Sequence, residues 1–131
     1  MSQPSLPSNG ISSPYKAKIL RLHFCENDKY NGKPLCEAII AKCREMKIAG
    51  ATAFRGLEGY GEAAEIHRHH LVTHDQPIVI VIVDTPENVE RLKPVVEDMI
   101  HTGVTAVSDA EVTRVQKRET EDHVQTDTDR P

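Results

Sequence analysis

The most constraining feature of the sequence is an unbroken run of six β-branched residues, Ile78 to Val83, followed by Asp84. Branching at Cβ favours extended backbone, and the run is far shorter than the roughly 20 residues that a membrane-spanning helix needs. It therefore predicts a strand over residues 78–84. Because every position in the run is apolar, we expect both faces of this strand to be buried, which requires a cover on each side of the sheet.

The segments on either side of this strand alternate between strand-like and helix-like patterns. Apolar residues at every second position predict strands, and apolar residues three or four positions apart predict amphipathic helices. The expected elements are a strand over 18–25, a polar connection over 26–33, a helix over 34–47, a strand over 51–55, an extended segment over 66–73, the strand over 78–84, a helix that Thr85 caps and that runs toward Gly103, and, after a loop, a strand over 111–116.

The order strand, helix, strand, strand, helix, strand predicts the α+β class and a ferredoxin-like split βαβ sandwich, βαββαβ. In this fold an antiparallel sheet carries both helices on one face. The other face is then bare, and self-association is the simplest way to cover it.

Polar segments are expected to flank this domain. Residues 1–16 are predicted to be a disordered tail, residues 17–118 the domain, and residues 119–131 a disordered acidic tail. No secretory signal is visible in the first 30 residues, which favours a cytoplasmic location without membrane insertion. The chain has 16 Lys and Arg against 20 Asp and Glu and only 4% aromatic residues, which argues against a nucleic-acid partner.

Two linked sequence patterns stand on either side of the first predicted helix. The pattern E-x-D-x-Y-x-G-x-P-L is carried by Glu26, Asp28, Tyr30, Gly32, Pro34 and Leu35. The pattern G-A-T-x-x-R-G-x-x-G-x-G is carried by Gly50, Ala51, Thr52, Arg55, Gly56, Gly59 and Gly61. Together they resemble the PII-like signalling superfamily, in its uncharacterised domain-of-unknown-function branch, over residues 17–116.

The resemblance implies a compact homotrimer that regulates rather than catalyses. It implies a small anionic effector, an adenine nucleotide, bound at clefts between subunits, and a loop over residues 56–68 that signals to a transporter or an enzyme. The nitrogen-regulatory members carry a glycine-lysine phosphate loop before the last strand, whereas the corresponding residues 101–111 of this sequence contain Gly103 but no Lys or Arg. A basic segment after the last strand has only a loose counterpart in Arg114, Lys117 and Arg118, which we include among the ligand-binding candidates.

The glycine-punctuated stretch after the second predicted strand is the main candidate for ligand binding. Its glycines, Gly56, Gly59 and Gly61, let backbone N–H groups approach an anion, Arg55 is a fork-shaped partner for phosphate or carboxylate, and Glu58 can accept from a hydroxyl or an amine. The alternative is an ordinary flexible loop in which Arg55 pairs with Glu58 or with Glu26.

Glu26, Asp28 and Tyr30 follow the first predicted strand and are expected near the base of that loop. They can orient a ligand or close a subunit contact. The alternative is turn chemistry, in which Asp28 or Asn31 bonds its own backbone.

Four histidines within eight residues, His67, His69, His70 and His74, suggest a second function class. In an extended segment His67 and His69 share a face and can reach one Zn²⁺ or Cu²⁺, so the alternative is a trimeric metal-binding or metal-tolerance protein. The other interpretations are a polar histidine-rich loop and a pH-sensitive contact.

The remaining candidates are less specific. The sequence contains no nucleophile elbow, P-loop or H-E-x-x-H motif, so we expect no enzyme activity. Cys36 and Cys43 fit a helix core, and Cys25 is either a reactive thiol or a buried apolar residue. A protein-docking module without a small ligand is the third function that the sequence allows.

Overall fold

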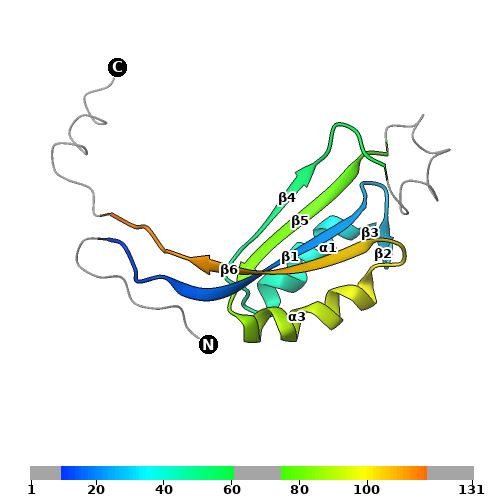
Figure 1. Cartoon of the computed structure of the whole chain (residues 1–131). Helices are drawn as coiled ribbons and strands as arrows, with labels where there is room; N and C mark the ends of the chain where they lie inside the picture. The colour runs from blue at the N-terminus through cyan, green and yellow to red at the C-terminus, as the bar shows by residue number, and fades with distance from the viewer. Residues whose placement is uncertain (1–9, 61–74, 118–131) are drawn as a thin grey trace, which may run out of the picture. The chain divides into compact units, whose positions relative to one another are not determined.

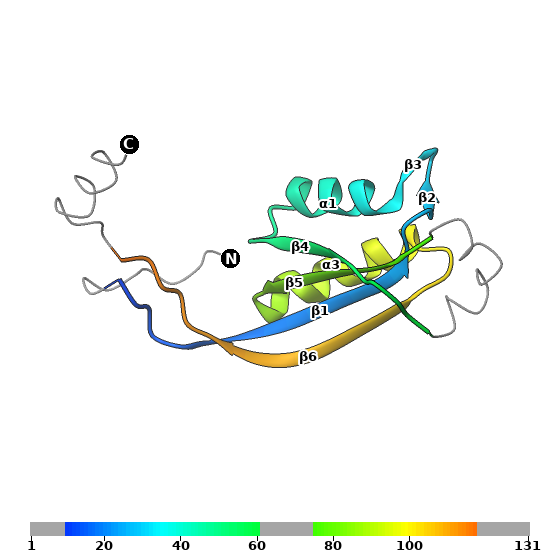
Figure 2. The same cartoon turned by 90° about the horizontal axis from the view of Figure 1, so that it is seen from above.

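The computed structural model describes residues 10–60 and 75–117. The elements are β1 (Tyr15–Cys25), β2 (Lys29–Tyr30), β3 (Lys33–Pro34), α1 (Leu35–Glu45), β4 (Ala51–Arg55), β5 (Pro77–Asp84), α3 (Pro86–Met99) and β6 (Val104–Val112). The long strands form one sheet in the order β4–β5–β1–β6, and β2 and β3 form a separate hairpin. This is the predicted ferredoxin-like α+β fold, with an antiparallel sheet and two helices (Figures 1 and 2).

Strand β5 is one of the two inner strands of the sheet, as its apolar sequence predicts. It pairs antiparallel with β1, where Leu22 lies opposite Ile80, and antiparallel with β4, where Ala53 lies opposite the same residue. Its alternate residues Ile78, Ile80 and Ile82 are buried beneath the helices. The prediction of a strand over residues 78–84 is confirmed, with one further residue at its start.

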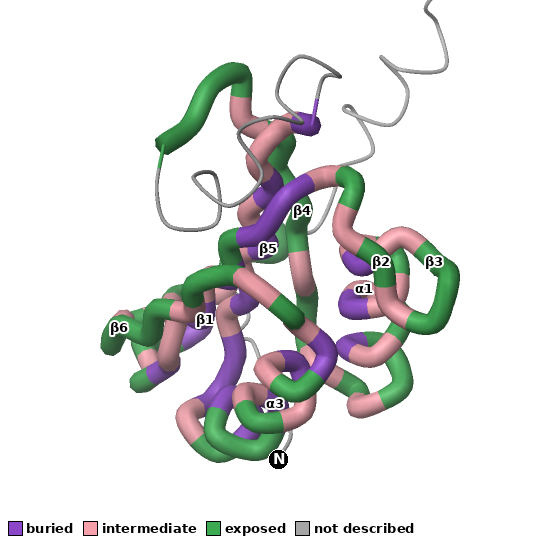
Figure 3. Tube along the Cα trace, turned by 90° about the vertical axis from the view of Figure 1, so that its right-hand side faces the viewer, coloured by how far each residue is buried: buried purple, intermediate pink, exposed green. Residues whose placement is uncertain are grey.

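Both helices cover the same face of the sheet (Figure 3). Each contributes an apolar stripe at the spacing that the sequence predicts. The stripe of α1 is Leu35, Ile39 and Cys43, and that of α3 is Val89, Leu92, Val96 and Met99. These side chains pack with alternate residues of β1 and β5 in a single hydrophobic cluster.

Capping hydrogen bonds and prolines mark where the two helices begin. The hydroxyl of Thr85 caps α3 by accepting from the amide of Asn88 at 3.3 Å, and Pro86 occupies the first helical position, as predicted. The helix continues through Pro94 and ends at Met99, short of Gly103. Pro34 precedes α1 and pairs with Lys29 in the hairpin, so α1 begins one residue later than predicted.

The connection predicted over residues 26–33 contains an unpredicted hairpin, β2–β3. Asn31 and Gly32, with φ of 50° and 81°, form the two-residue link between its strands. Positive φ at both positions is typical of the type I′ turn, for which Asn-Gly is the preferred dipeptide.

The prediction of the last strand was wrong in its position. Strand β6 begins at Val104, seven residues before the predicted start at Glu111. Of the predicted range, only Glu111 and Val112 lie in β6. Thr105 connects β6 to α3, since its hydroxyl donates to Glu97 at 2.6 Å, and Lys93 donates to the same carboxylate at 2.8 Å. These two hydrogen bonds lower the pKa of Glu97, that from Lys93 having the larger effect.

Among residues 10–60 and 75–117, no helix covers the second face of the sheet. Cross-strand partners place on it Ile19, Arg21 and His23 of β1, Thr52 and Phe54 of β4, and Val79, Val81 and Val83 of β5. Phe54 is 55% exposed, and the three valines are half-buried, so only the helix-covered face of β5 is fully buried within one chain. We call these eight residues the open sheet face.

The chain divides into two units: residues 16–110, and the two segments that flank them. In the second unit, which we call the terminal ribbon (described residues 10–15 and 111–117), Ile11 bridges to Val115. The amide of Ser12 donates to the carbonyl of Arg114 at 2.8 Å, and that of Gln116 donates to Gly10 at 2.6 Å. Part of the predicted N-terminal tail is thus paired, and Tyr15 and Lys16 belong to β1.

In the part of the chain that the structure describes, no helix is both long enough and apolar enough to cross a bilayer.

Candidate functional site

Several loops meet at one end of the sheet (Figure 1). Strand β1 ends there at Cys25 and β4 ends there at Arg55, while β5 starts there at Pro77. The connection from α3 to β6, residues 100–103, lies at the same end. The two sequence patterns are therefore brought together, as predicted for a split βαβ sheet.

An ion pair joins the two patterns directly. The guanidinium of Arg55 contacts the carboxylate of Glu26. The Arg55 side chain is 65% exposed and that of Glu26 is 29% exposed, so the pair lies at the surface, where a ligand can compete for either partner. Such pairs contribute little stability, typically below about 1 kcal/mol. Pairing of Arg55 with Glu26 was one of the two alternatives that the sequence left open.

The turn that carries Glu26 is fixed by its backbone. The amide of Glu26 donates to the carbonyl of Gln76 at 2.8 Å, and the amide of Asn27 donates to the buried carboxylate of Asp75 at 2.9 Å. These bonds attach the end of β1 to the start of β5. The Glu26 side chain therefore projects from a rigid position.

Asp28 and Tyr30 have structural contacts of their own. The Asp28 carboxylate accepts the amide of Cys25 at 3.1 Å, and its main-chain carbonyl accepts the amide of Leu35 at 2.8 Å. These contacts match the alternative given for Asp28 in the sequence analysis, in which its side chain bonds the backbone of its own turn. Tyr30 is half-buried against the hydrophobic cluster.

The glycine stretch packs against Pro77. The amide of Gly56 donates to the Pro77 carbonyl at 2.7 Å, and a Cβ at Gly56 or Gly59 would meet Pro77 Cγ at 2.7 or 3.0 Å. In the orientation that satisfies its amide, Gln76 donates to the carbonyls of Gly56 and Leu57 at 3.2 and 3.1 Å. Close packing therefore explains two of the glycines. Glu58 is exposed, and within the described residues no ion pair connects it to Arg55.

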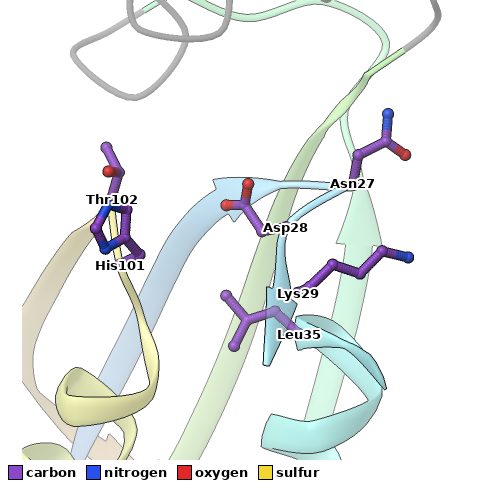
Figure 4. A pocket seen from close by; sticks show the side chains of 6 residues that line it. All are labelled: Asn27, Asp28, Lys29, Leu35, His101 and Thr102. Atoms are coloured by element: carbon purple, nitrogen blue, oxygen red, sulfur yellow. The ribbon is translucent and has the colours of Figure 1, made fainter. Parts of the chain in front are cut away.

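A cavity of about 310 Å³ opens beside the turn that follows β1 (Figure 4). Its lining residues come from the turn after β1, from the start of α1 and from the α3–β6 connection. They are Asn27, Asp28, Lys29, Leu35, His101 and Thr102. Of these, sequence reasoning selected only Asp28 as a site residue. The others come from the turn after β1 and the adjoining β2, from the start of α1 and from the α3–β6 connection, and only the topology of the sheet indicates that these segments meet.

The remaining basic candidates lie in or beyond the terminal ribbon. Arg114 donates its amide to the Ser12 hydroxyl at 2.7 Å and its guanidinium to the Gln116 side chain at 3.0 Å. Lys117 is exposed. Arg118 lies outside the described residues.

The metal hypothesis also concerns residues outside the described part. His67, His69, His70, His74 and Gly61 all fall in the range 61–74, which the structure does not describe. Among residues 10–60 and 75–117, no group of three or more His, Cys, Asp or Glu side chains is arranged to hold a metal ion. The histidine cluster therefore stays a prediction.

The cysteines are core residues in the reduced state. Cys25 and Cys43 are buried and Cys36 is half-buried, and all three are free thiols. Burial raises the pKa of Cys25 to about 11, with a further contribution from Asp75 and Asp28, and burial alone raises the pKa of Cys43 to about 11. Since the thiolate is the reactive species, Cys25 is not an activated thiol.

Comparison with known proteins agrees with this architecture. The fold is that of the PII-like proteins, and the chain belongs to the DUF190 family, described as "Uncharacterized ACR, COG1993", whose model matches residues 17–112. It is 32% identical over 99 residues to the UPF0166 protein of Aquifex aeolicus (strain VF5), covering 74% of this chain and 93% of that protein. It is 33% identical over 100 residues to the UPF0166 protein MJ1524 of Methanocaldococcus jannaschii, covering 74% and 92%.

Solved structures of a PII-like protein share the fold. The apo form of CPII from Thiomonas intermedia K12, a nitrogen regulatory PII-like protein, matches with a TM-score of 0.58 and 23% identity over 79% of this chain and 98% of that one. A 2.3 Å structure of CPII bound to ADP, AMP and bicarbonate matches with a TM-score of 0.52 and 20% identity over 76% and 98%. The resemblance that the two sequence patterns suggested is confirmed.

Proposed function

We propose that this protein is a PII-like regulator rather than a catalyst. It binds a small anionic effector, an adenine nucleotide, at clefts between the subunits of a homotrimer. It signals to a protein partner through residues 56–68, of which residues 61–68 lie outside the described part. The choice of effector is supported by CPII, which has been solved with ADP, AMP and bicarbonate.

The observation that carries the proposal is the ion pair between Arg55 and Glu26. Arg55 is the last residue of β4, directly before the glycine stretch, and its guanidinium is accessible from solvent. An anion that binds the guanidinium competes with the Glu26 carboxylate, because both need the same fork of N–H donors. Binding therefore exchanges a contact to the end of β1 for a contact to the effector, at the base of the segment that signals.

The homotrimer is supported by the open sheet face. The apolar side chains of this face lie next to one another across three strands, and Phe54 is more than half exposed within one chain. An exposed aromatic side chain beside half-buried apolar residues on a sheet face without a helix is typical of an interaction site. Copies of the same chain bury it without any further partner.

A panel of thermal melts on the chelator-treated protein tests the ligand class. ADP, AMP, ATP, bicarbonate and Zn²⁺ are added separately, since a ligand that binds the native state raises the midpoint by mass action. We expect a rise with at least one adenine nucleotide. Zn²⁺ alone raising the midpoint would instead favour the histidine hypothesis, and no response to any of the five would contradict effector binding by this class.

Arg55→Ala makes the panel specific to the site. We expect this variant to lose the nucleotide-dependent rise while its own melt without ligand stays close to that of the wild type, because the lost ion pair is exposed. Arg44→Ala is the matched control, since Arg44 is an exposed arginine at the far end of α1. An equal response in Arg55→Ala and Arg44→Ala would defeat the role of Arg55.

A further inference from the structure

The open sheet face, opposite the two helices (Figure 3), carries basic side chains and no acidic one. Arg21 and His23 stand two positions apart on the same side of β1. The other members of this face are apolar residues and Thr52. A subunit contact through the open sheet face therefore buries these two basic groups, and the face itself supplies no carboxylate to pair with them.

The neighbouring strands add no charge beside His23. Val79 lies opposite His23 on β5, and the other β5 residues on this face are also valines. On β6 the Ser108 hydroxyl accepts from the Arg21 guanidinium at 3.3 Å, so Ser108 lies on the same side of the sheet. Because side chains alternate along a strand, the β6 residues that share this side are uncharged. They are Val104, Ala106, Ser108 and Ala110.

The ionisable groups of the adjoining segments lie elsewhere. Asp109, the acidic residue within residues 104–110 of β6, contacts Lys18 at 3.7 Å, and Lys18 alternates onto the side of β1 that carries the buried Leu20. In the α3–β6 connection, Gly103 packs against the main-chain carbonyl of His23, whereas His101 lines the cavity together with Leu35 of the hydrophobic cluster. Arg21 is therefore the charged group that shares the face with His23.

The His23 imidazole can take up a proton within one chain. His23 is exposed, and in the described part of the chain no hydrogen bond or ion pair involves its imidazole. Histidine is the side chain whose charge ordinarily changes between about pH 5 and 8. A subunit contact strips water from a charged imidazole, and Arg21 repels it. Protonation of His23 thus favours separate subunits over the assembly.

We propose that protonation of His23 dissociates the homotrimer, so that subunits assemble through the open sheet face at about pH 8 and separate at about pH 5.5. This inference rests on the trimer of the proposed function. In a symmetric assembly each copy contributes the same surface, so each adds its own His23 and Arg21 to the contact. Acidification places one further positive charge per subunit beside an existing guanidinium. Because the proposed effector clefts lie between subunits, dissociation also removes them.

Sedimentation of the full-length, chelator-treated protein at about pH 8 and about pH 5.5 tests the proposal. At one protein concentration, the wild type should have the mass of three chains at the higher pH and a lower mass at the lower pH. His23→Gln, which stays neutral, should keep the mass of three chains at both. His23→Lys, which stays charged, should have a lower mass at both. Should His23→Lys fail to fold, the comparison of His23→Gln with the wild type decides.

His101→Gln is the matched control, since His101 is an exposed histidine outside the open sheet face. We expect it to dissociate at the lower pH as the wild type does, and the histidines within residues 67–74 are unchanged in every variant. A wild type that keeps three chains at both pH values, or equal dissociation of His23→Gln and the wild type, would overturn the inference and leave the trimer standing. A wild type with the mass of one chain at about pH 8 would contradict the trimer itself, and this inference with it.

Discussion

At the scale of single residues, the thiols show how position decides chemistry. Cys43 is 3% exposed in the hydrophobic cluster, and burial raises its pKa from the usual 9.0 to about 11. A thiol that keeps its proton does not attack electrophiles or bind metal. The three cysteines are therefore packing residues at physiological pH.

The raised pKa of Cys43 makes stability depend on alkaline pH. Below about pH 9 the Cys43 thiol is protonated in both the folded and the unfolded chain, so its ionisation does not lower the free energy of unfolding. Between pH 9 and 11 the unfolded chain loses the proton first, so the free energy of unfolding falls, by about 2 kcal/mol at pH 11 for this thiol. Urea unfolding at pH 8 and at pH 10.5 should show a smaller loss for Cys43→Ala than for the wild type. Equal losses in the two proteins would contradict the assignment.

Single residues were also where prediction from sequence reached its limit. The pairing of Arg55 with Glu26 was foreseen as an alternative, because Glu26 follows the first predicted strand and was expected near the base of the glycine loop that Arg55 precedes. The positions of His101 and Thr102 in the cavity lining were not foreseen, because the sequence analysis considered residues 101–111 only for their lack of Lys and Arg. They become lining residues only when the α3–β6 connection meets the β1 turn, which is a property of the tertiary fold.

At the scale of elements, the β2–β3 hairpin depends on its turn. Gly32 has φ of +81°, where a residue with a Cβ is strained, although nothing lies within 4 Å of a Cβ built there. We expect Gly32→Ala to lower the free energy of unfolding by about 1 kcal/mol. Gly50→Ala is the matched control, since Gly50 has the same open surroundings without a positive φ.

Denaturant unfolding of the two glycine variants measures this difference. We expect Gly50→Ala to be as stable as the wild type or slightly more stable, because alanine restricts the unfolded chain. A cost at Gly32 no larger than at Gly50 would show that the turn conformation contributes nothing.

The helices and strands differ in how closely their sequences predict them. Strand β5 and helix α3 were predicted closely because burial demands a continuous or periodic apolar pattern. Strand β6 was misplaced because it is an edge strand whose residues are mostly exposed, so its sequence, VTAVSDAEV, carries little alternation. The hairpin was missed although the Asn-Gly dipeptide, a known turn signal, was present.

At the scale of the whole molecule, the open sheet face is the surface through which we expect the subunits to assemble. One cover, formed by the two helices, is present within the chain, and the central strand is apolar on both sides. The proposed trimer supplies the second cover.

Phe54→Asp tests the assembly. Because Phe54 is 55% exposed in one chain, a charge there costs the fold little but places an unpaired carboxylate in the proposed subunit contact. Sedimentation should give three times the mass of one chain for the wild type and a lower mass for the variant. Leu57→Asp, at a residue that is 98% exposed in the glycine stretch, should keep the wild-type mass. A monomeric wild type, or an intact trimer in Phe54→Asp, would contradict this use of the face.

In the proposed function, an anionic effector competes with Glu26 for Arg55. Titration calorimetry of ADP into the wild type, Arg55→Ala and Glu26→Gln tests this competition. Loss of a charge-assisted contact should weaken binding to Arg55→Ala at least tenfold. Removal of the competing carboxylate should strengthen binding to Glu26→Gln by up to about fivefold, the worth of an exposed ion pair. Opposite changes in the two variants are the predicted result, and unchanged affinity in Arg55→Ala or equal weakening in both would contradict the account.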